Sequence, residues 1–373
     1  MASVASILEV LRPYARAMLH WLRPEREIRF ETCEALFPDA HREQLLPPKT
    51  IATPDLADAT CVPGVAQYAS ATYTCPAVEA VELENVLYCP TNNVVLTAEG
   101  QIVAESSTTI RRPEYIDTHA ISARRVENLP GTHTALRSRF NHYYHHLIDH
   151  ASRLYFLNDP ALATYPSVGL LLQDGPTPFE TYLLNRLKPP HVEPIRLRHR
   201  RLYRIERYVL LTPMTRRHAG YQRQPYLRAF EEAFLPDRPS TASERIYVGR
   251  RPKGSKGRKV LNEQAVMETL RPLGFNHYLL EDLSFEEQAR LFYDAEAVVA
   301  PHGAGLANLI YANDAKVIEY FPSHHIVPSF YFLAKSKGLP YTRLHGSEQW
   351  REDDFEMDTD RLMLALNHFG LTE

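Results

Sequence analysis

The sequence has no run of apolar residues long enough to cross a bilayer as a helix. Its net charge is only −3 over 373 residues, which argues against a general nucleic-acid-binding protein, because such binding needs a broad basic surface. The four cysteines lack the C-x-x-C spacing of a zinc site, so we expect free thiols in a reducing compartment rather than a disulfide framework. A G-x-x-x-x-G-K-[ST] phosphate loop is also missing.

What is present is an ordinary globular composition, with 44% hydrophobic residues and enough chain for two domains. Residues 235–243 contain two prolines and no apolar periodicity, which is typical of a linker. We place an N-terminal domain at residues 1–240 and a C-terminal domain at 241–373. Residues 7–22 predict an amphipathic helix that either packs on its own domain or contacts a membrane surface. They are not a signal peptide, because charged residues and Pro13 interrupt the apolar stretch.

Strands and helices alternate clearly after residue 243, which predicts a parallel, doubly wound α/β sheet. We expect strands at 245–249, 278–280, 297–300 and 317–320, and helices at 262–270, 284–295, 306–311, 330–337 and 358–369. Ser284 and Glu287 form a capping box at the start of the second of these helices. Earlier in the chain we expect strands at 86–96, 101–105, 168–172 and 208–211, and helices at 141–157 and 181–187.

A glycine loop follows the apolar strand at 297–300 and opens a helix. It reads Pro-His-Gly-Ala-Gly-Leu-Ala-Asn over residues 301–308. Two glycines allow close approach of a ligand, and a helix N-terminus attracts anions, so the loop predicts phosphate binding, with a plain tight turn as the alternative. His302 is expected either to donate to a phosphate or to satisfy nearby backbone.

A basic segment follows the strand at 245–249, with six basic residues and no acidic residue between 250 and 259. Arg250 stands at the strand end, where α/β sheets bind ligands, and its guanidinium suits a diphosphate. Glu319 ends another buried strand, where a carboxylate binds a ribose or pairs with an arginine. The arginines between 195 and 207 predict a strand with one basic face, either solvated or in contact with an anionic partner.

A histidine-rich helix is expected in the first domain. Asn141, His145 and Asp149 share one face at helical spacing, and a histidine oriented by a carboxylate is a general-base arrangement. Ordinary half-buried polar contacts and a metal site remain alternatives for these histidines.

These motifs together resemble glycosyltransferase family 61. The family shows Y-x-S-R, R-R-x-x-N-E, E-Q-x-x-x-x-x-A, H-G-A-G-L-x-N and V-x-E segments, matched here from Tyr247, Arg258, Gln288, His302 and Val317. Its upstream Y-x-H-W-x-x-D-x-x-x-R segment is similar to residues 143–153. Three positions depart from the pattern: Gly249 replaces a serine, Lys259 an arginine and His146 an aromatic residue.

The resemblance implies a GT-B fold, with two Rossmann-like domains facing across a cleft and a last helix that crosses back. It implies an inverting transfer from a nucleotide sugar, often a UDP-sugar, to a glycan or glycolipid acceptor, with no cofactor or essential metal. The donor side is then Arg250, Arg258, Lys259, His302, Gly303, Ala304, Gly305, Leu306, Asn308 and Glu319. The acceptor side is Asn141, His146 and Arg153, with either His145 or Asp149 as the base.

A hexosyl- or pentosyltransferase of polysaccharide or capsule biosynthesis is therefore the expected function, located in the cytoplasm at the inner face of a membrane. The rival interpretation is a non-catalytic nucleotide- or glycan-binding module of the same fold. The aligned His145 and Asp149 argue against that rival, because a binding module needs no base.

Overall fold

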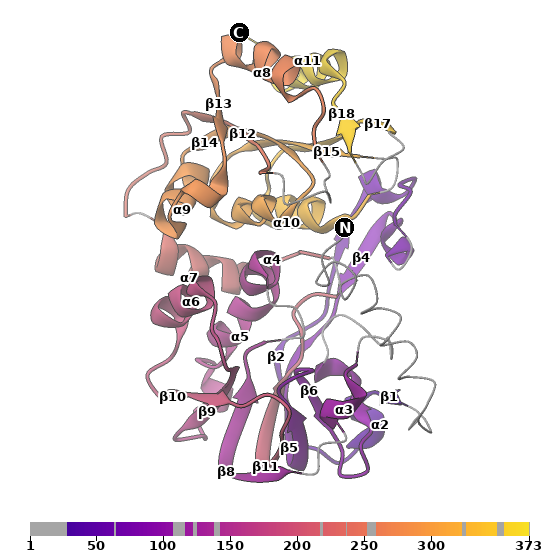
Figure 1. The fold of residues 1–373 in the computed structure, drawn as a ribbon, viewed down its shortest axis with the longest axis vertical. Coiled ribbons are helices and arrows are strands. Elements are labelled where there is room, and N and C mark those ends of the chain that lie inside the picture. Colours follow the sequence, from indigo (N-terminus) through magenta and orange to yellow (C-terminus); the bar gives the residue numbers. More distant parts are fainter. Residues whose placement is uncertain are drawn as a thin grey trace, which may run out of the picture.

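The computed structural model describes residues 28–62, 65–106, 116–121, 125–137, 142–216, 219–235, 237–251, 259–322, 326–348 and 354–372 (Figure 1). The expected amphipathic segment at 7–22 lies outside these residues. Among the described helices, none is both long and apolar enough to cross a membrane. All four cysteines are buried free thiols, as expected.

The first part of the chain builds a nine-stranded sheet with the order β1-β7-β6-β5-β11-β8-β9-β10, and β2 pairs with β5. Four neighbouring strands, β11, β8, β9 and β10, run parallel, whereas β5 is antiparallel to β2, β6 and β11. The sheet is therefore mixed rather than wholly parallel. Its strands are β1 (Phe30–Glu31), β2 (Arg42–Leu46), β5 (Val78–Cys89), β6 (Val94–Leu96), β7 (Ile102–Val103), β8 (Val126–Ala135), β9 (Val168–Gln173), β10 (Val192–Leu197) and β11 (Leu202–Leu211).

Short helices and one small hairpin complete this part of the chain. The hairpin pairs β3 (Lys49–Ala52) with β4 (Thr72–Cys75). The helices are α2 (Cys33–Leu36), η1 (Pro54–Leu56), η2 (Ala66–Tyr68), η3 (Ala104–Ser106), α3 (Thr118–Ile121), α4 (Tyr143–His145), η5 (His146–His150), α5 (Ala151–Phe156), η6 (Pro160–Leu162), α6 (Pro178–Leu187) and α7 (Gln224–Phe234). The expected helix at 141–157 is thus continuous through α4, η5 and α5, with a wider π-helical turn at η5.

The second part of the chain forms the expected parallel sheet, in the order β13-β12-β14-β15-β16. Helices α8 and α11 pack on one face, while α9, η9 and α10 cover the other (Figure 1). The elements are β12 (Glu244–Val248), α8 (Glu263–Leu270), η7 (Arg271–Leu273), β13 (Phe275–Tyr278), η8 (Leu280–Asp282), α9 (Phe285–Tyr293), β14 (Ala295–Pro301), η9 (Ala304–Tyr311), β15 (Lys316–Phe321), α10 (Ser329–Lys337), β16 (Tyr341–His345), β17 (Ser347–Glu348), β18 (Phe355–Glu356) and α11 (Thr359–His368).

Several sequence expectations about local structure are confirmed and others are wrong. The capping box is present, since Ser284 and Glu287 exchange both hydrogen bonds at the start of α9. The expected strand at 86–96 is broken by a turn in which Asn93 takes a left-handed φ of 49°. The arginine-rich strand expected at 195–207 is two strands, β10 and β11, because Arg200 turns the chain with a φ of 60°. The strand expected at 278–280 ends at Tyr278, where it enters η8.

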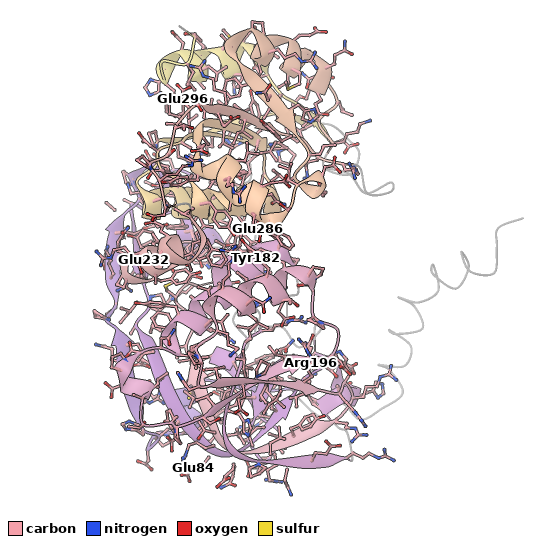
Figure 2. All side chains as sticks on the ribbon, turned by 90° about the vertical axis from the view of Figure 1, so that its left-hand side faces the viewer. Glu84, Tyr182, Arg196, Glu232, Glu286 and Glu296 are labelled. Atoms are coloured by element: carbon pink, nitrogen blue, oxygen red, sulfur yellow. The ribbon has the colours of Figure 1, made fainter. Side chains whose placement is uncertain are left out.

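One hydrophobic core runs through the waist between the two sheets. It joins Leu154, Phe179 and Phe230 of the first part to Leu306 and Phe330 of the second. Figure 1 shows α4, α6 and α7 facing α9 and α10 there. Figure 2 labels Tyr182 on α6 and Glu286 on α9, which meet at this waist. The α/β class is confirmed, and the elements on the two sides of the waist are in direct contact.

Candidate active site

The carboxyl edge of the parallel sheet changes direction between β12 and β14. The chain runs from β12 outward to β13, then crosses back to β14 and continues to β15 and β16. Such a switch point leaves a crevice in which α/β sheets bind their ligands. Arg250 follows β12 and the glycine loop follows β14, so both predicted phosphate-binding elements lie at this one point.

Arg250 and the glycine loop are in contact. A Cβ atom on Gly303 would lie 3.3 Å from Nη2 and 3.4 Å from Cζ of Arg250, so the guanidinium rests on the bare backbone of this glycine. Arg250 Nη1 also donates to the carbonyl of His302 at 3.4 Å. The absence of a side chain at 303 thereby places a fixed positive charge directly beside the loop amides.

The helix that follows the loop is 3₁₀ rather than α. The amide of Leu306 already donates to the Gly303 carbonyl at 3.0 Å, whereas Ala304 and Gly305 stand at the helix start, where no intrahelical acceptor is available. Ala304 is exposed and Gly305 is half-buried, so this end of the helix faces outward. A Cβ on Gly305 would lie 2.9 Å from Leu280, which explains the second glycine by packing.

The side chains of Leu306 and Asn308 lie in the interior, and a donor contact for these two residues stays a prediction. Both are buried, at 1% and 0% exposure. The Asn308 amide nitrogen donates to Gln288 and to the Gly305 carbonyl, at 3.1 and 3.0 Å. Asn308 therefore fixes the loop from beneath, and Leu306 anchors it in the core.

His302 is held by two residues behind it. Its Nδ1 lies 2.5 Å from Oε1 of Glu319, whose Oε2 accepts a hydrogen bond of 2.6 Å from the Tyr341 hydroxyl. Glu319 is fully buried. Both oxygens of its carboxylate have partners, one a histidine and the other a tyrosine. This geometry resembles the expected pairing with an arginine, except that the partner is a histidine. The ribose contact for Glu319 stays a prediction.

A second histidine–carboxylate pair lies on the helix of the first part. His145 Nδ1 is 2.5 Å from Oδ2 of Asp149, and the Thr215 hydroxyl donates to Oδ1 of the same carboxylate at 3.4 Å. Because a carboxylate only accepts, Nδ1 carries the proton and Nε2 becomes the basic nitrogen of a neutral ring. This is the arrangement of a general base oriented by a carboxylate.

The other histidines of this helix have lowered pKa values. Burial lowers the pKa of His142 to about 4, with the charge of His145 adding to the effect. Burial also lowers the pKa of His146 to about 4, with Arg137 as the next cause, and it lowers the pKa of His150 further. These three side chains are therefore neutral at pH 7, whereas His145 lies within hydrogen-bond distance of the Asp149 carboxylate.

The predicted acceptor-side residues are not brought to the surface. His146 is 1% exposed and lies against His150 and Thr177. Arg153 is 5% exposed and donates from Nη1 to the backbone carbonyls of residues 135–137. Both side chains make interior polar contacts in this structure, and their acceptor role stays a prediction. Asn141 lies outside the described residues.

On the donor side, Arg258 also lies outside the described residues. Lys259 is exposed, and its backbone pairs with residues 354 and 355 through Asp354 and Phe355. In the described residues nothing places its side chain at the switch point. No three His, Cys, Asp or Glu side chains gather as metal ligands in the described parts of the chain.

The departure at Gly249 has a structural cause. A Cβ at this position would lie 1.9 Å from Nε2 of His277, so the imidazole fills the space of the serine side chain that the family pattern carries here. The same imidazole faces Glu263 at 3.9 Å, and Glu263 accepts a hydrogen bond from Tyr247. Glycine at position 249 therefore leaves the room that the His277 side chain on β13 occupies.

The two histidine–carboxylate pairs are linked across the waist. The Tyr143 hydroxyl, two residues before His145, donates to Oδ1 of Asn308 at 2.5 Å. Phe330 of α10 contacts the His302 ring on one side and the Tyr144 ring on the other, at centroid distances of 5.4 and 5.7 Å. The helix that carries the predicted base and the predicted phosphate loop are therefore in contact at the waist.

Five contributors to this site had no role in the sequence analysis. Tyr143 lay within a matched motif without a function, while Phe330, Thr215, Tyr341 and His277 carried no signal because their partners are distant in the chain. The pairing of β15 with β16 brings Tyr341 to Glu319, and only the register of that pairing identifies the contact.

A polar cavity of about 480 Å³ opens beyond the end of β16, beside the same sheet edge. The His345 ring contacts Phe321 at 6.1 Å, and Phe321 stacks on His302 at 5.0 Å, so a row of rings leads from the phosphate loop to the cavity. The lining residues are His345, Gly346, Ser347, Glu356, Met357, Asp358 and Arg361.

Comparison with known proteins shows a similarity to glycosyltransferases in the sequence around this site. The family model described as Glycosyltransferase 61 matches residues 143–318, a stretch that contains His145, Asp149, Arg250 and the glycine loop. This match confirms the resemblance to glycosyltransferase family 61 seen in the motifs.

A β-1,2-xylosyltransferase from Arabidopsis thaliana is similar to part of the chain. It is 29% identical over 101 residues, which cover 23% of this chain and 19% of the relative. The match thus spans about a fifth of that relative's length.

Proposed function

We propose that this protein transfers a sugar from a UDP-sugar to a glycan hydroxyl with inversion, without a metal, and with His145 as the base. The observation that carries the proposal is the 2.5 Å contact between His145 Nδ1 and Asp149, which fixes the tautomer a base requires. Asp149 is the orienting group, since it also accepts from Thr215.

In this mechanism the donor diphosphate lies at the switch point between β12 and β14. Arg250 and the amides of residues 304 and 305 hold its oxygens. His302, with both ring nitrogens protonated, donates from Nδ1 to Glu319 and from Nε2 to the diphosphate. These fixed donors stabilise the charge that develops on the departing diphosphate, the task that a metal has in other transferases. The nucleoside occupies the cavity beyond β16, whose volume is in the range of ligand pockets.

The reaction then proceeds in one displacement. The acceptor hydroxyl oxygen attacks the anomeric carbon from the face opposite the diphosphate, while its proton passes to Nε2 of His145. The bond between the anomeric carbon and the phosphate oxygen breaks, and its electron pair leaves with the diphosphate. His145 later returns the proton to water.

The arrangement of the chain in this proposal is GT-B-like, with an N-terminal domain at 1–240 and a C-terminal domain at 241–373. Support comes from the two sheets on either side of the waist and from the site that draws residues from both. The cytoplasmic location, the capsule or polysaccharide pathway and the membrane contact stay predictions.

The test compares adjacent arginines. Arg250→Ala is expected to raise the Kd for UDP and to lower transfer at least about 10-fold, since a lost charge-assisted bond costs about 1.5–3 kcal/mol. Arg251→Ala is the matched control, because Arg251 is exposed and pairs with Asp282 at the surface. UDP-xylose is the first donor to try, because the similar Arabidopsis protein is named for xylosyl transfer. Equal UDP affinity and turnover in the two variants contradict the donor site, and inhibition by EDTA that one divalent ion reverses contradicts the metal-free mechanism.

A further inference from the structure

The hydroxyl of Tyr143 belongs to the best-defined polar chain between the two parts of the site. Tyr143 donates to Oδ1 of Asn308 at 2.5 Å, and these two residues are 165 positions apart in the sequence. Asn308 in turn donates to the Gly305 carbonyl, in the glycine loop itself. The side chains of Tyr143 and Asn308 therefore join the helix that carries His145 to the loop proposed to hold the diphosphate.

The direction of every hydrogen bond in this chain is fixed. Gln288 donates to the backbone carbonyls of Leu280 and Leu283, so its Oε1 faces Asn308. Asn308 must then donate to Gln288, at 3.1 Å, and to Gly305, which uses both hydrogens of its amide nitrogen. Its oxygen is left to accept, and Tyr143 supplies that hydrogen. Because Asn308 has no exposed surface, water does not take the place of the tyrosine.

The same tyrosine is rigidly packed. Its ring contacts Phe179 of α6 at 4.4 Å and Phe285 of α9 at 6.4 Å, one from each side of the waist. Burial raises the pKa of its hydroxyl above its ordinary value, so the group remains protonated and a donor. The ring of Tyr143 is therefore held in place, and its protonated hydroxyl donates to Asn308.

We propose that Tyr143 is a positioning residue, whose hydroxyl sets the distance and orientation of His145 relative to the phosphate loop through Asn308. This inference rests on the proposed function, because it concerns how the base and the donor site are held together. Tyr143 touches neither substrate, and it acts on the rate by keeping two groups from opposite sides of the waist in register.

The chain offers a matched control in Tyr182. Its ring contacts the same Phe179 and Phe285, at 5.8 and 5.3 Å, and it lies at the waist in Figure 2. Its buried hydroxyl has no hydrogen-bond partner among the described residues. Tyr143→Phe and Tyr182→Phe thus remove the same atom from the same aromatic cluster, and only the first breaks the link to the loop.

The experiment measures UDP affinity by calorimetry and the kinetics of UDP-sugar turnover, well below the melting temperature of each variant. Tyr143→Phe is expected to lower kcat about 10–100-fold while the Kd for UDP stays within about threefold, since a small misplacement of reacting groups costs about this much. Tyr182→Phe is expected to match the wild type in both. A kcat for Tyr143→Phe equal to that of Tyr182→Phe overturns the proposal, whatever its melting temperature.

A double-mutant cycle with Asn308→Ala shows whether the effect passes through Asn308. If it does, Tyr143→Phe lowers kcat in the wild-type background and has little further effect beside Asn308→Ala. Two independent, additive losses in kcat overturn the assigned route.

Hydrogen exchange gives a readout that does not depend on turnover. UDP is expected to slow exchange in residues 143–149 of the wild type and of Tyr182→Phe, but not of Tyr143→Phe. A wild type that binds UDP and shows this pattern without turning over any sugar supports the link while the proposed reaction fails. Turnover with identical exchange in all three proteins supports the reaction and overturns the link.

Discussion

The two histidine–carboxylate pairs of this protein share a geometry and differ in their surroundings. Nδ1 lies 2.5 Å from a carboxylate oxygen in both His145–Asp149 and His302–Glu319. Asp149 keeps 12% of its side chain exposed and sits four residues along the same helix, whereas Glu319 is fully buried and comes from a neighbouring strand. In the proposed mechanism the same contact serves two purposes: the first pair prepares a base, and the second orients a donor beside the proposed phosphate loop.

Replacing His145 tests the difference most strongly. His145→Ala is expected to lower kcat about 10²–10⁴-fold, the usual contribution of a general base, with the Kd for UDP unchanged. Asp149→Asn is expected to lower kcat less, because it leaves a base in a poorly defined tautomer. Steady-state kinetics and UDP calorimetry on folded variants check both. If His145→Ala loses UDP affinity but keeps kcat, His145 acts in donor binding and not as the base.

Replacing His302 is expected to act on binding rather than on the chemical step. His302→Ala removes one charge-assisted donor, so the Kd for UDP is expected to rise about 10–100-fold. His368→Ala, at the end of α11, serves as a control histidine on an exposed position. An unchanged Kd with a large loss of kcat would assign the base to His302 instead.

Acidification is expected to affect the helix that carries the first pair. The pKa values of His146 and His150 are depressed by burial, to about 4 for His146 and further for His150. Below pH 6.5 the unfolded chain therefore binds protons that the folded chain refuses, and stability falls as the pH drops toward 4. Urea unfolding is expected to show a loss of about 2 kcal/mol for each of these two histidines, about 4 kcal/mol together, between pH 7 and pH 5. His146→Gln should reduce that loss, and an equal loss in the variant contradicts the assignment.

The smallest expected effect concerns Gly249, which directly follows β12. Gly249→Ser restores the residue of the family pattern but meets the imidazole of His277. Since the ring is partly exposed, it can turn aside, and the expected cost is about 1 kcal/mol of stability with a small loss of UDP affinity. Combining Gly249→Ser with His277→Ala is expected to remove the cost. A double variant as impaired as the single one would show that the clash is not the cause.

The order of the elements and the identity of the motifs were readable from the sequence because they depend on short stretches of chain. The capping box at Ser284, the strands after residue 243 and the spacing of His145 and Asp149 on one helix all follow from local periodicity. The mistakes also have local causes. Arg200 and Asn93 take left-handed conformations that divide what look like continuous strands, and neither is glycine.

What the sequence alone determined is thus the resemblance to the family, the parallel sheet and the two motifs on which the proposed site rests, the His145 helix and the loop after β14. Tertiary structure alone decided which polar groups face one another. It buried Glu319 against His302 and Tyr341, placed His146 and Arg153 in the interior, and brought the Tyr143 hydroxyl to Asn308. The physical reason is that hydrogen bonds between residues distant in the chain depend on strand register and on packing at the waist, which no local pattern records.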